Sequence, residues 1–496
     1  MSSVLPEVLL WLYISTLSGM CLFGLHKVKI LWLYLRATRR GSPPPPVWTG
    51  PLPKVCVQCP LFNEPLVVEA LLERVTALRW PAGLLEIQIL DDSTDETPAI
   101  IERWLQAHPD QALNVRHIRR PNRGGYKAGA LAYAMTRTEA EFFAIFDADF
   151  RPEPDFLEVL MPHFADAKVG VVQARWEFNN RRASLLTRFQ AIFLDAHFVV
   201  EQSARSSAGL FFNFNGTAGI WRRAALDGAG GWTPDTVTED LDASYRAQLR
   251  GWRFVYLPDY AVASELPENL TAFKSQQRRW TKGGIQVMRK QLGTILASQV
   301  PGRLKREAAC HLMVGFIHPL LVMFSLIFVP YLLIGARLPG GWLIFNPVVV
   351  VLTSGATVAL YISGQYFRQR QWREGLLLLV AAPLMLAFGL AMSVTCCVAV
   401  VEGLFQRGGE FVRTPKGGRD ITVGGVLSRI RSRTLFATIT LIELAVGVMM
   451  LGGAIYFGHR DMEAIALVLL LKATGFLGIA CISTVDLLPR TGEAGA

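Results

Sequence analysis

Six long apolar runs constrain what this 496-residue chain can fold into more than any other feature of its sequence. Each run is long enough to cross the hydrocarbon core of a bilayer as a helix, which takes about 20 predominantly apolar residues. The sequence therefore predicts an integral membrane protein. The first run has no small-residue cleavage site after a short apolar core, so we expect an anchor and not a removable signal peptide. The runs lie at 6–35, 309–335, 343–366, 374–403, 434–457 and 463–488.

Positive charges beside the apolar runs predict which side of the membrane faces the cytoplasm. Arg36, Arg39 and Arg40 close the first run, and Arg429 and Arg433 precede a later one. Segments rich in Lys and Arg stay on the cytoplasmic side of a membrane. The net charge of +10 thus belongs largely to membrane boundaries. We therefore expect no binding to nucleic acid.

Hydropathy divides the chain into seven parts. The run at 374–403 contains Pro383 and Gly389 and fits either a kinked span or an interfacial helix, so five or six crossings are predicted. The parts are an N-terminal transmembrane anchor (1–38), a proline-rich linker (39–53), an α/β domain (54–275), a QxxRW motif with an interfacial amphipathic helix (276–300), transmembrane or interfacial helices (301–405), a loop with a basic cytosolic segment (406–433) and a C-terminal transmembrane hairpin (434–489).

The part from 54 to 275 alternates short apolar strands with helical patterns. Continuous apolar strands of this kind predict a mostly parallel sheet that helices cover on both faces. Ligands of such sheets bind beyond the carboxyl ends of the strands. Acidic clusters follow two of the strands directly, so we expect them at that edge. The clearest strands are at 54–60, 84–90 and 141–146.

The two acidic clusters each have a chemical and a structural explanation. Asp92, in Asp91-Asp92, can accept hydrogen bonds from a nucleoside, or the pair can cap the helix that follows. Asp147 and Asp149 form a D-x-D motif whose oxygens suit a hard divalent cation that also binds a diphosphate. Solvated turns produce the same motif.

Two further motifs are equally open when each is taken alone. Lys127 follows glycines and opens a helix, and a helix N-terminus with an ammonium group favours phosphate. An ordinary loop is the alternative. Glu239 and Asp240 start an amphipathic helix, where acids stabilise the N-terminus. They can also supply a general base.

The stretch QQRRW, residues 276–280, stands just upstream of the second apolar run. Arg and Trp are common anchors at the membrane interface. The alternative is that Gln276, Arg279 and Trp280 close a site next to the membrane. Apolar residues 285, 288, 292 and 295 then share one helical face, which predicts an amphipathic helix lying in the interface.

Together, in this order, the motifs resemble those of the cellulose-synthase-like membrane glycosyltransferases of family 2, which have a GT-A fold. The resemblance covers about residues 54–420 and is greatest to synthases of mannan, glucomannan and the xyloglucan backbone. It implies a Rossmann-like α/β domain in the cytosol joined to an α-helical transmembrane region. The motifs are PLFNE (60–64), DD (91–92), YKAGAL (126–131), DAD (147–149), FNGTAGIWR (214–222), TED (238–240) and QQRRW (276–280).

The resemblance assigns the donor side of an active site. It implies that Asp149 holds Mg²⁺ or Mn²⁺, with help from Asp147. The residues implied in binding a nucleotide sugar are Glu64, Asp92, Lys127, Asp147, Gln276 and Arg279.

The resemblance also assigns the acceptor side. It implies that Asp240, with Glu239 beside it, is the catalytic base that takes the proton from an acceptor hydroxyl. A gating loop is implied at 409–418, where Arg413 departs from the family pattern. The acceptor-binding residues are Trp280, Asn215, Gly216 and Thr217, and the gating-loop residues are Phe411, Thr414 and Lys416.

The implied function is inverting transfer from UDP-glucose or GDP-mannose to a growing β-linked polysaccharide, with translocation and export partner proteins as further possibilities. The implied location is a membrane, and we expect a bacterial inner membrane with the catalytic domain in the cytoplasm. One alternative is a glycosyltransferase that places the sugar on a lipid, ceramide or diacylglycerol. A transporter with a regulatory domain is another, which would need polar residues inside its spans.

Overall fold

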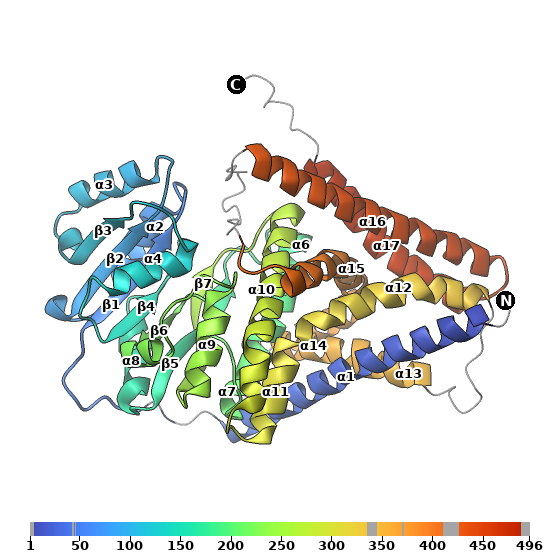
Figure 1. Ribbon diagram of the computed structural model, residues 1–496, viewed down its shortest axis with the longest axis horizontal. Coiled ribbons are helices and arrows are strands. Elements are labelled where there is room, and N and C mark those ends of the chain that lie inside the picture. The colour runs from blue at the N-terminus through green and yellow to red at the C-terminus, as the bar shows by residue number, and fades with distance from the viewer. Residues whose placement is uncertain are drawn as a thin grey trace.

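The computed structural model describes residues 4–41, 44, 46–334, 345–369, 372–409 and 426–487. The chain forms an α/β domain and a bundle of long helices, and Figure 1 shows the domain on the left and the bundle on the right. The predicted combination of a Rossmann-like α/β domain with an α-helical membrane region is confirmed.

A seven-stranded mixed sheet forms the centre of the α/β domain. Its strands follow the order β3-β2-β1-β4-β6-β5-β7. The first four strands in this order are parallel, as their apolar runs predict, whereas β6 runs antiparallel to both of its neighbours. The strands are β1 (Val55–Leu61), β2 (Leu85–Asp91), β3 (Val115–Arg119), β4 (Phe142–Ile145), β5 (Val169–Phe178), β6 (Gly219–Arg222) and β7 (Arg253–Ser264).

Helices cover both faces of the sheet. Leu71 of α2 and Ile101 of α3 belong to the apolar core on one face, and Leu131 of α4 and Ala243 of α9 belong to the core on the other. This layering leaves the carboxyl ends of β1, β2 and β4 open at one edge of the domain. The helices are α2 (Val68–Thr76), α3 (Thr97–Ala107), α4 (Tyr126–Met135), α5 (Phe156–Leu160), α6 (Leu185–Asp195), α7 (Gln202–Ser207), α8 (Arg223–Gly228) and α9 (Glu239–Leu249).

Long apolar helices make up the second part of the molecule. Six segments in the described part of the chain are long and apolar enough to cross a membrane, in agreement with an integral membrane protein. They lie at Val4–Arg40, Val314–Leu333, Val348–Arg368, Gly375–Phe405, Arg433–Gly458 and Glu463–Asp486. The helices are α1 (Val4–Arg40), α10 (Leu270–Ala297), α11 (Gly302–Leu312), α12 (Ile317–Leu333), α13 (Phe345–Val350), α14 (Ala356–Gln369), α15 (Trp372–Phe405), α16 (Val426–Gly458) and α17 (Glu463–Leu487).

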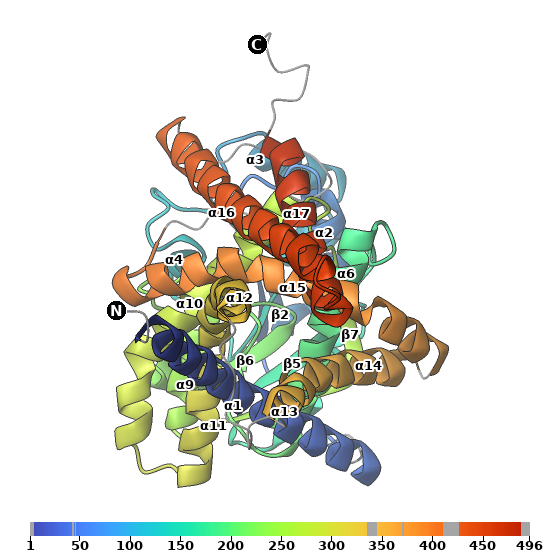
Figure 2. The same ribbon diagram turned by 90° about the vertical axis from the view of Figure 1, so that its right-hand side faces the viewer.

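One of these candidate spans, α15, packs against α10 and the long helices α12, α14 and α17, and it also contacts α6 of the α/β domain. Phe388, in its middle, contacts Phe189 of α6 edge-on, with ring centroids 5.7 Å apart. Near its end, Glu402 accepts a hydrogen bond from Arg278 of α10. Figure 2 shows α15 running across the view. These contacts favour the interfacial helix among the two interpretations of 374–403, and the number of crossings stays a prediction.

The helix that carries QQRRW differs from its prediction. Ile285 and Ile295 are fully buried against Tyr245, Leu312 and other apolar residues of the protein. The face of residues 285, 288, 292 and 295 therefore packs inside the molecule and does not lie on the bilayer. Amphipathic spacing marks a buried face without saying whether protein or lipid covers it.

Two predicted boundaries also shift. α1 continues to Arg40, past the anchor boundary at 38, and α10 begins six residues before the boundary at 276. Asn269 caps α10 because its side-chain oxygen accepts a hydrogen bond from the Ala272 amide at 2.7 Å. The Lys274 ammonium then pairs at 2.7 Å with the Glu443 carboxylate of α16, which ties this helix to the membrane bundle.

Candidate active site

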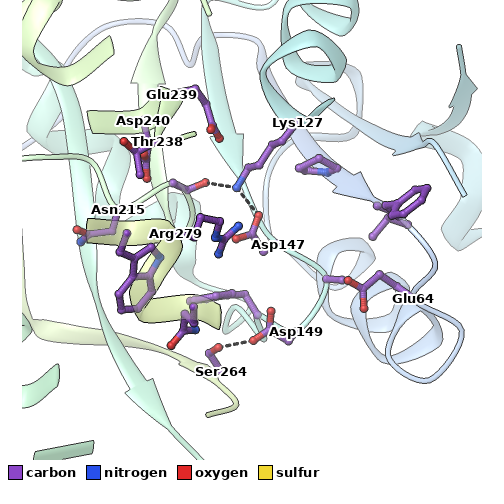
Figure 3. A pocket seen from close by; sticks show the side chains of 18 of the residues that line it. Glu64, Lys127, Asp147, Asp149, Asn215, Thr238, Glu239, Asp240, Ser264 and Arg279 are labelled. Carbon is purple, nitrogen blue, oxygen red and sulfur yellow. Dashed lines mark hydrogen bonds and ion pairs between the residues drawn. The ribbon is translucent and has the colours of Figure 1, made fainter. Parts of the chain in front are cut away.

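A pocket opens at the carboxyl edge of the sheet, between the strand ends and the helices α9 and α10. Figure 3 shows charged side chains from these elements pointing into one space. The structure brings together nearly all residues that the sequence assigns to a site. The assigned residues that line the pocket are Glu64, Asp92, Lys127, Asp147, Asp149, Asn215, Gly216, Glu239, Asp240, Gln276, Arg279 and Trp280.

Lys127 stands at the start of α4, where the backbone makes a left-handed turn. Gly125 has a φ of 70°, which costs a residue without a side chain little. The Lys127 ammonium donates hydrogen bonds to the Asp147 carboxylate and, at 2.9 Å, to the Gly216 carbonyl. Burial opposes its charge, but the carboxylates of Asp147 and Glu239 outweigh that effect and raise the pKa of Lys127. The ammonium is therefore a permanent cation in the pocket.

Glu239 and Asp240 occupy the first turn of α9. Burial raises the pKa of the Glu239 carboxyl. Burial, followed by the neighbouring Glu239 carboxylate, raises the pKa of Asp240 to about 7. Lys127 and Arg279 act in the opposite direction and favour the ionised form. A carboxyl group with such a pKa can accept a proton near neutral pH.

Gly216 lets the backbone approach these carboxyl groups closely. Its φ is 83°, and a methyl group added there would lie 2.8 Å from the Asp240 carboxylate oxygen Oδ2 and 3.6 Å from Lys127 Nζ. Space for a reacting hydroxyl at Asp240 thus depends on a missing side chain.

The D-x-D motif follows β4 and places one carboxylate on each side of a short turn. Asp149 is almost completely buried, and its Oδ2 accepts hydrogen bonds from the Ser264 hydroxyl and, at 3.4 Å, from the Glu265 amide. Among the described residues, no group of three or more His, Cys, Asp or Glu side chains forms a complete metal cage. Mg²⁺ commonly takes only one or two carboxylates from the protein and the rest from phosphates and water. Asp147 and Asp149 fit that arrangement.

Thr217 is the one assigned residue in the described chain that does not line the pocket. It is fully buried, and its hydroxyl accepts a hydrogen bond from the Asp147 amide at 2.9 Å. This contact holds the turn that carries the D-x-D motif. Thr217 therefore stabilises the D-x-D turn from the protein interior and does not line the pocket in which an acceptor would bind.

Sequence reasoning missed a cation that holds Asp92. Arg120 Nε donates to Asp92 Oδ1 at 2.9 Å, a second guanidinium nitrogen donates to Oδ2, and both side chains are buried. Arg120 also donates to the carbonyls of Gly124 and Tyr126, which precede Lys127. Its position directly after β3 at the carboxyl edge is the signal that could have revealed it.

Two more missed residues close the end of the pocket near Glu64. The Arg123 guanidinium carbon lies 3.2 Å from the centre of the Phe62 ring, and both residues line the pocket. A flat aromatic ring with a guanidinium beside it offers a surface for stacking a base. Phe62 lies within the motif PLFNE, but the sequence assigned a role only to Glu64 of that motif and none to Arg123.

The opposite end of the pocket is apolar on one side. Trp280 is partly buried and packs against the cluster of Phe178, Leu194 and Leu266. Figure 3 shows Asn215 at this side and Glu64 at the other. An indole ring with one face toward a pocket can stack on the apolar face of a sugar ring. The proposed gating-loop residues Phe411, Thr414 and Lys416 lie outside the described residues.

Comparison with known sequences and structures adds independent information. The profile of "Glycosyl transferase family group 2" matches residues 142–401, and that of "Glycosyl transferase family 2" matches residues 56–227. A mannosyltransferase from Pyrobaculum calidifontis, solved with GDP-Man and Mn²⁺, shares the fold at a TM-score of 0.56 and 22% identity, over 80% of this chain and 99% of that one.

Curated relatives align over different lengths. Glucomannan 4-beta-mannosyltransferase 2 of Arabidopsis thaliana is 47% identical over 252 residues, 50% of this chain and 47% of the relative. Probable glucomannan 4-beta-mannosyltransferase 1 of the same plant is 35% identical over 454 residues, 86% of this chain and 76% of the relative. The alignment with the first thus spans about half of that relative's length. Both are plant proteins, so they do not support the expected bacterial inner membrane.

Proposed function

The chain belongs to glycosyl transferase family 2, and on this premise we propose that it transfers a sugar from a nucleotide sugar to a growing β-linked polysaccharide. One observation carries the proposal. A single pocket holds the carboxyl pair of Glu239, which is buried, and Asp240, which is partly buried, beside the cations Lys127 and Arg279. A transferase needs both a base for the acceptor and positive charge for the leaving diphosphate.

The cations serve the donor. Lys127 and Arg279 line the same pocket as the D-x-D motif, and a guanidinium can bind two phosphate oxygens at once. Asp147 and Asp149 are the residues that would hold Mg²⁺ or Mn²⁺. Such an ion, when bound, neutralises charge on the departing diphosphate. At the far end, Asp92 and Phe62 would bind the nucleoside.

The carboxyl pair serves the acceptor. As the acceptor oxygen forms its bond to the anomeric carbon, the bond from that carbon to the diphosphate breaks and the hydroxyl proton passes to Asp240. A single displacement inverts the anomeric centre, so an α-linked donor gives a β-linkage. Trp280 would hold the acceptor ring so that its hydroxyl faces Asp240. Asn215 would contribute a polar contact.

The names of the relatives bear on the choice of sugar. Several are named glucomannan 4-beta-mannosyltransferases, which supports mannose as the transferred sugar and GDP-mannose ahead of UDP-glucose as the donor. The basic residues Arg36, Arg39 and Arg40 at the end of α1 support a cytoplasmic α/β domain. Translocation of the product and the involvement of export partners stay predictions.

The test is to incubate membranes that contain the chain with a panel of radiolabelled nucleotide sugars and a divalent cation. We expect label in a polymer that an endo-β-mannanase or an endo-β-glucanase degrades, with the larger amount from GDP-mannose. Membranes from cells without the chain are the control. Label that is entirely soluble in organic solvent would identify a lipid acceptor instead, and no incorporation from any donor would overturn the proposal.

A further inference from the structure

The active-site helix α10 continues beyond the pocket along one face. Arg279 and Trp280 line the pocket, and Gly283 and Gln286 follow them at intervals of three or four residues. Residues at this spacing share a face of a helix. The two later residues reach the segment that leads into the catalytic carboxyl groups.

Gly283 touches Thr238, the residue directly before the carboxyl pair. A methyl group added at Gly283 would lie 2.3 Å from Thr238 Cγ2 and 2.4 Å from its hydroxyl oxygen. Real side chains never approach this closely, so α10 and the start of α9 are as close here as a glycine allows. A methyl group added at the neighbouring Gly284 would have no atom of another part of the protein within 4 Å.

Gln286 joins the same segment by hydrogen bonds. Its side chain is almost completely buried, and its Oε1 accepts a hydrogen bond from the Val237 amide at 3.0 Å. Its Nε2 donates to the carbonyls of Gly408 at 2.7 Å and Gln406 at 3.2 Å. One amide group thus links α10, the segment before Asp240 and the chain that leaves α15.

We propose that Gly283 and Gln286 are positioning residues that set the place of Asp240 in the pocket. Neither contacts the pocket, and both act through Val237 and Thr238. This inference rests on the proposed function, because it assigns them an effect on the transfer step. A displacement of about 1 Å in an active site can lower the rate by about 10²-fold.

The first experiment compares Gly283→Ala with Gly284→Ala. Alanine has a higher helix propensity than glycine, so both variants should retain α10. Only Gly283→Ala pushes against Thr238. We expect it to lower kcat by about 10²-fold, with the Kd for the nucleoside diphosphate unchanged, while Gly284→Ala keeps native kcat. Equal kcat values in the two variants would overturn the inference.

The second experiment compares Gln286→Met with Gln291→Met. Gln291 is equally buried on α10 and donates at 2.8 Å to Asp242, which does not line the pocket. Hydrogen exchange in a peptide that covers Val237 should become faster in Gln286→Met only, since that variant alone frees this amide. The kcat should fall about 10-fold or more in the same variant, with the donor KM unchanged.

The two readouts separate failure of this inference from failure of the proposed function. If the native chain transfers sugar from no donor, the proposed function fails, and hydrogen exchange alone decides whether Gln286 holds the segment. Unchanged exchange at Val237 in Gln286→Met overturns the contact. Faster exchange with native kcat overturns the positioning role. Loss of kcat in Gln291→Met to the same extent assigns both glutamines to general stability.

Discussion

A carboxylate removes a proton from a hydroxyl only while it is ionised, and burial works against ionisation at Asp240. The positive charges of Lys127 and Arg279 favour the ionised carboxylate and therefore lower its pKa. The neighbouring Glu239 raises it again. The state of Asp240 therefore depends on three other side chains, of which Lys127 and Arg279 are brought to it by the fold.

The acidic limb of the pH–rate profile should report this balance. Asp240 has a pKa raised to about 7, so kcat/KM should fall as the pH drops below that value and the base takes up a proton. Glu239→Gln removes a negative neighbour, lowers the pKa of Asp240 and should move the limb to lower pH. Glu158→Gln, at an exposed site, is the control. If the apparent pKa of the acidic limb is the same in Glu239→Gln as in the native chain, a group other than Asp240 causes the limb.

Substitution of the base itself should separate chemistry from binding. Asp240→Asn keeps the shape of the side chain but cannot accept the proton, so turnover should fall by about 10²–10⁴-fold. Nucleoside diphosphate affinity, measured by calorimetry, should persist because Lys127 and Arg279 are unchanged. Near-native turnover in this variant would remove Asp240 from the role of base.

The candidate site could be predicted from the sequence where chemistry shows in residue type. Carboxylates and a lysine at strand ends and helix starts pointed to the pocket, and the structure brings them there. The place of Arg120 after a strand indicates the carboxyl edge, but its pairing with Asp92 could not be predicted, because only the fold brings the two together. Gly283 and Gln286 carry no chemical signal, since their importance lies in a distance between two helices.

At the scale of elements, the strands and helices of the α/β domain follow their apolar patterns closely. The strand predicted at 54–60 is observed at Val55–Leu61, and the one at 84–90 at Leu85–Asp91. The partner of an apolar face could not be predicted in the same way. Periodicity places Ile285 and Ile295 on one face of α10, but it does not distinguish a protein neighbour from lipid.

Two adjacent residues of α10 test which partner that face has. Ile295 is fully buried in the protein, whereas the Leu296 side chain is 55% exposed. Ile295→Ala should lower the free energy of unfolding by about 2–5 kcal/mol through loss of packing. Leu296→Ala should change it by less than about 0.5 kcal/mol. Unfolding of both variants in detergent measures the difference. An equal change in the free energy of unfolding would indicate that this face of α10 contacts the membrane interface and not the protein.

At the scale of the whole molecule, the course of α15 decides the topology. Six crossings would leave the end of α15 on the side opposite the α/β domain. Yet the Gly408 amide donates to the Asp235 carbonyl at 2.9 Å, and Lys282 donates to Gln406 at 2.7 Å. The chain after α15 thus meets the α/β domain, which five crossings explain.

Cysteine labelling can test this arrangement in sealed vesicles. With the exposed Cys310 and Cys481 replaced by Ser, Arg407→Cys should react from the same side as Leu113→Cys in the α/β domain. His459→Cys, between α16 and α17, should react from the other side. Six crossings would instead place Arg407→Cys on the side opposite Leu113→Cys and His459→Cys on the same side as Leu113→Cys.

The anomeric configuration of the product tests the central claim most directly. The pocket offers one base, Asp240, for one displacement at the anomeric carbon, so the purified chain should convert an α-linked nucleotide sugar into a β-linked product. NMR of the polymer made from ¹³C-labelled GDP-mannose, in detergent or nanodiscs, reads that configuration from the one-bond C1–H1 coupling. A new β-linkage is the result that we predict. An α-linkage would contradict the account, because retention requires a second displacement.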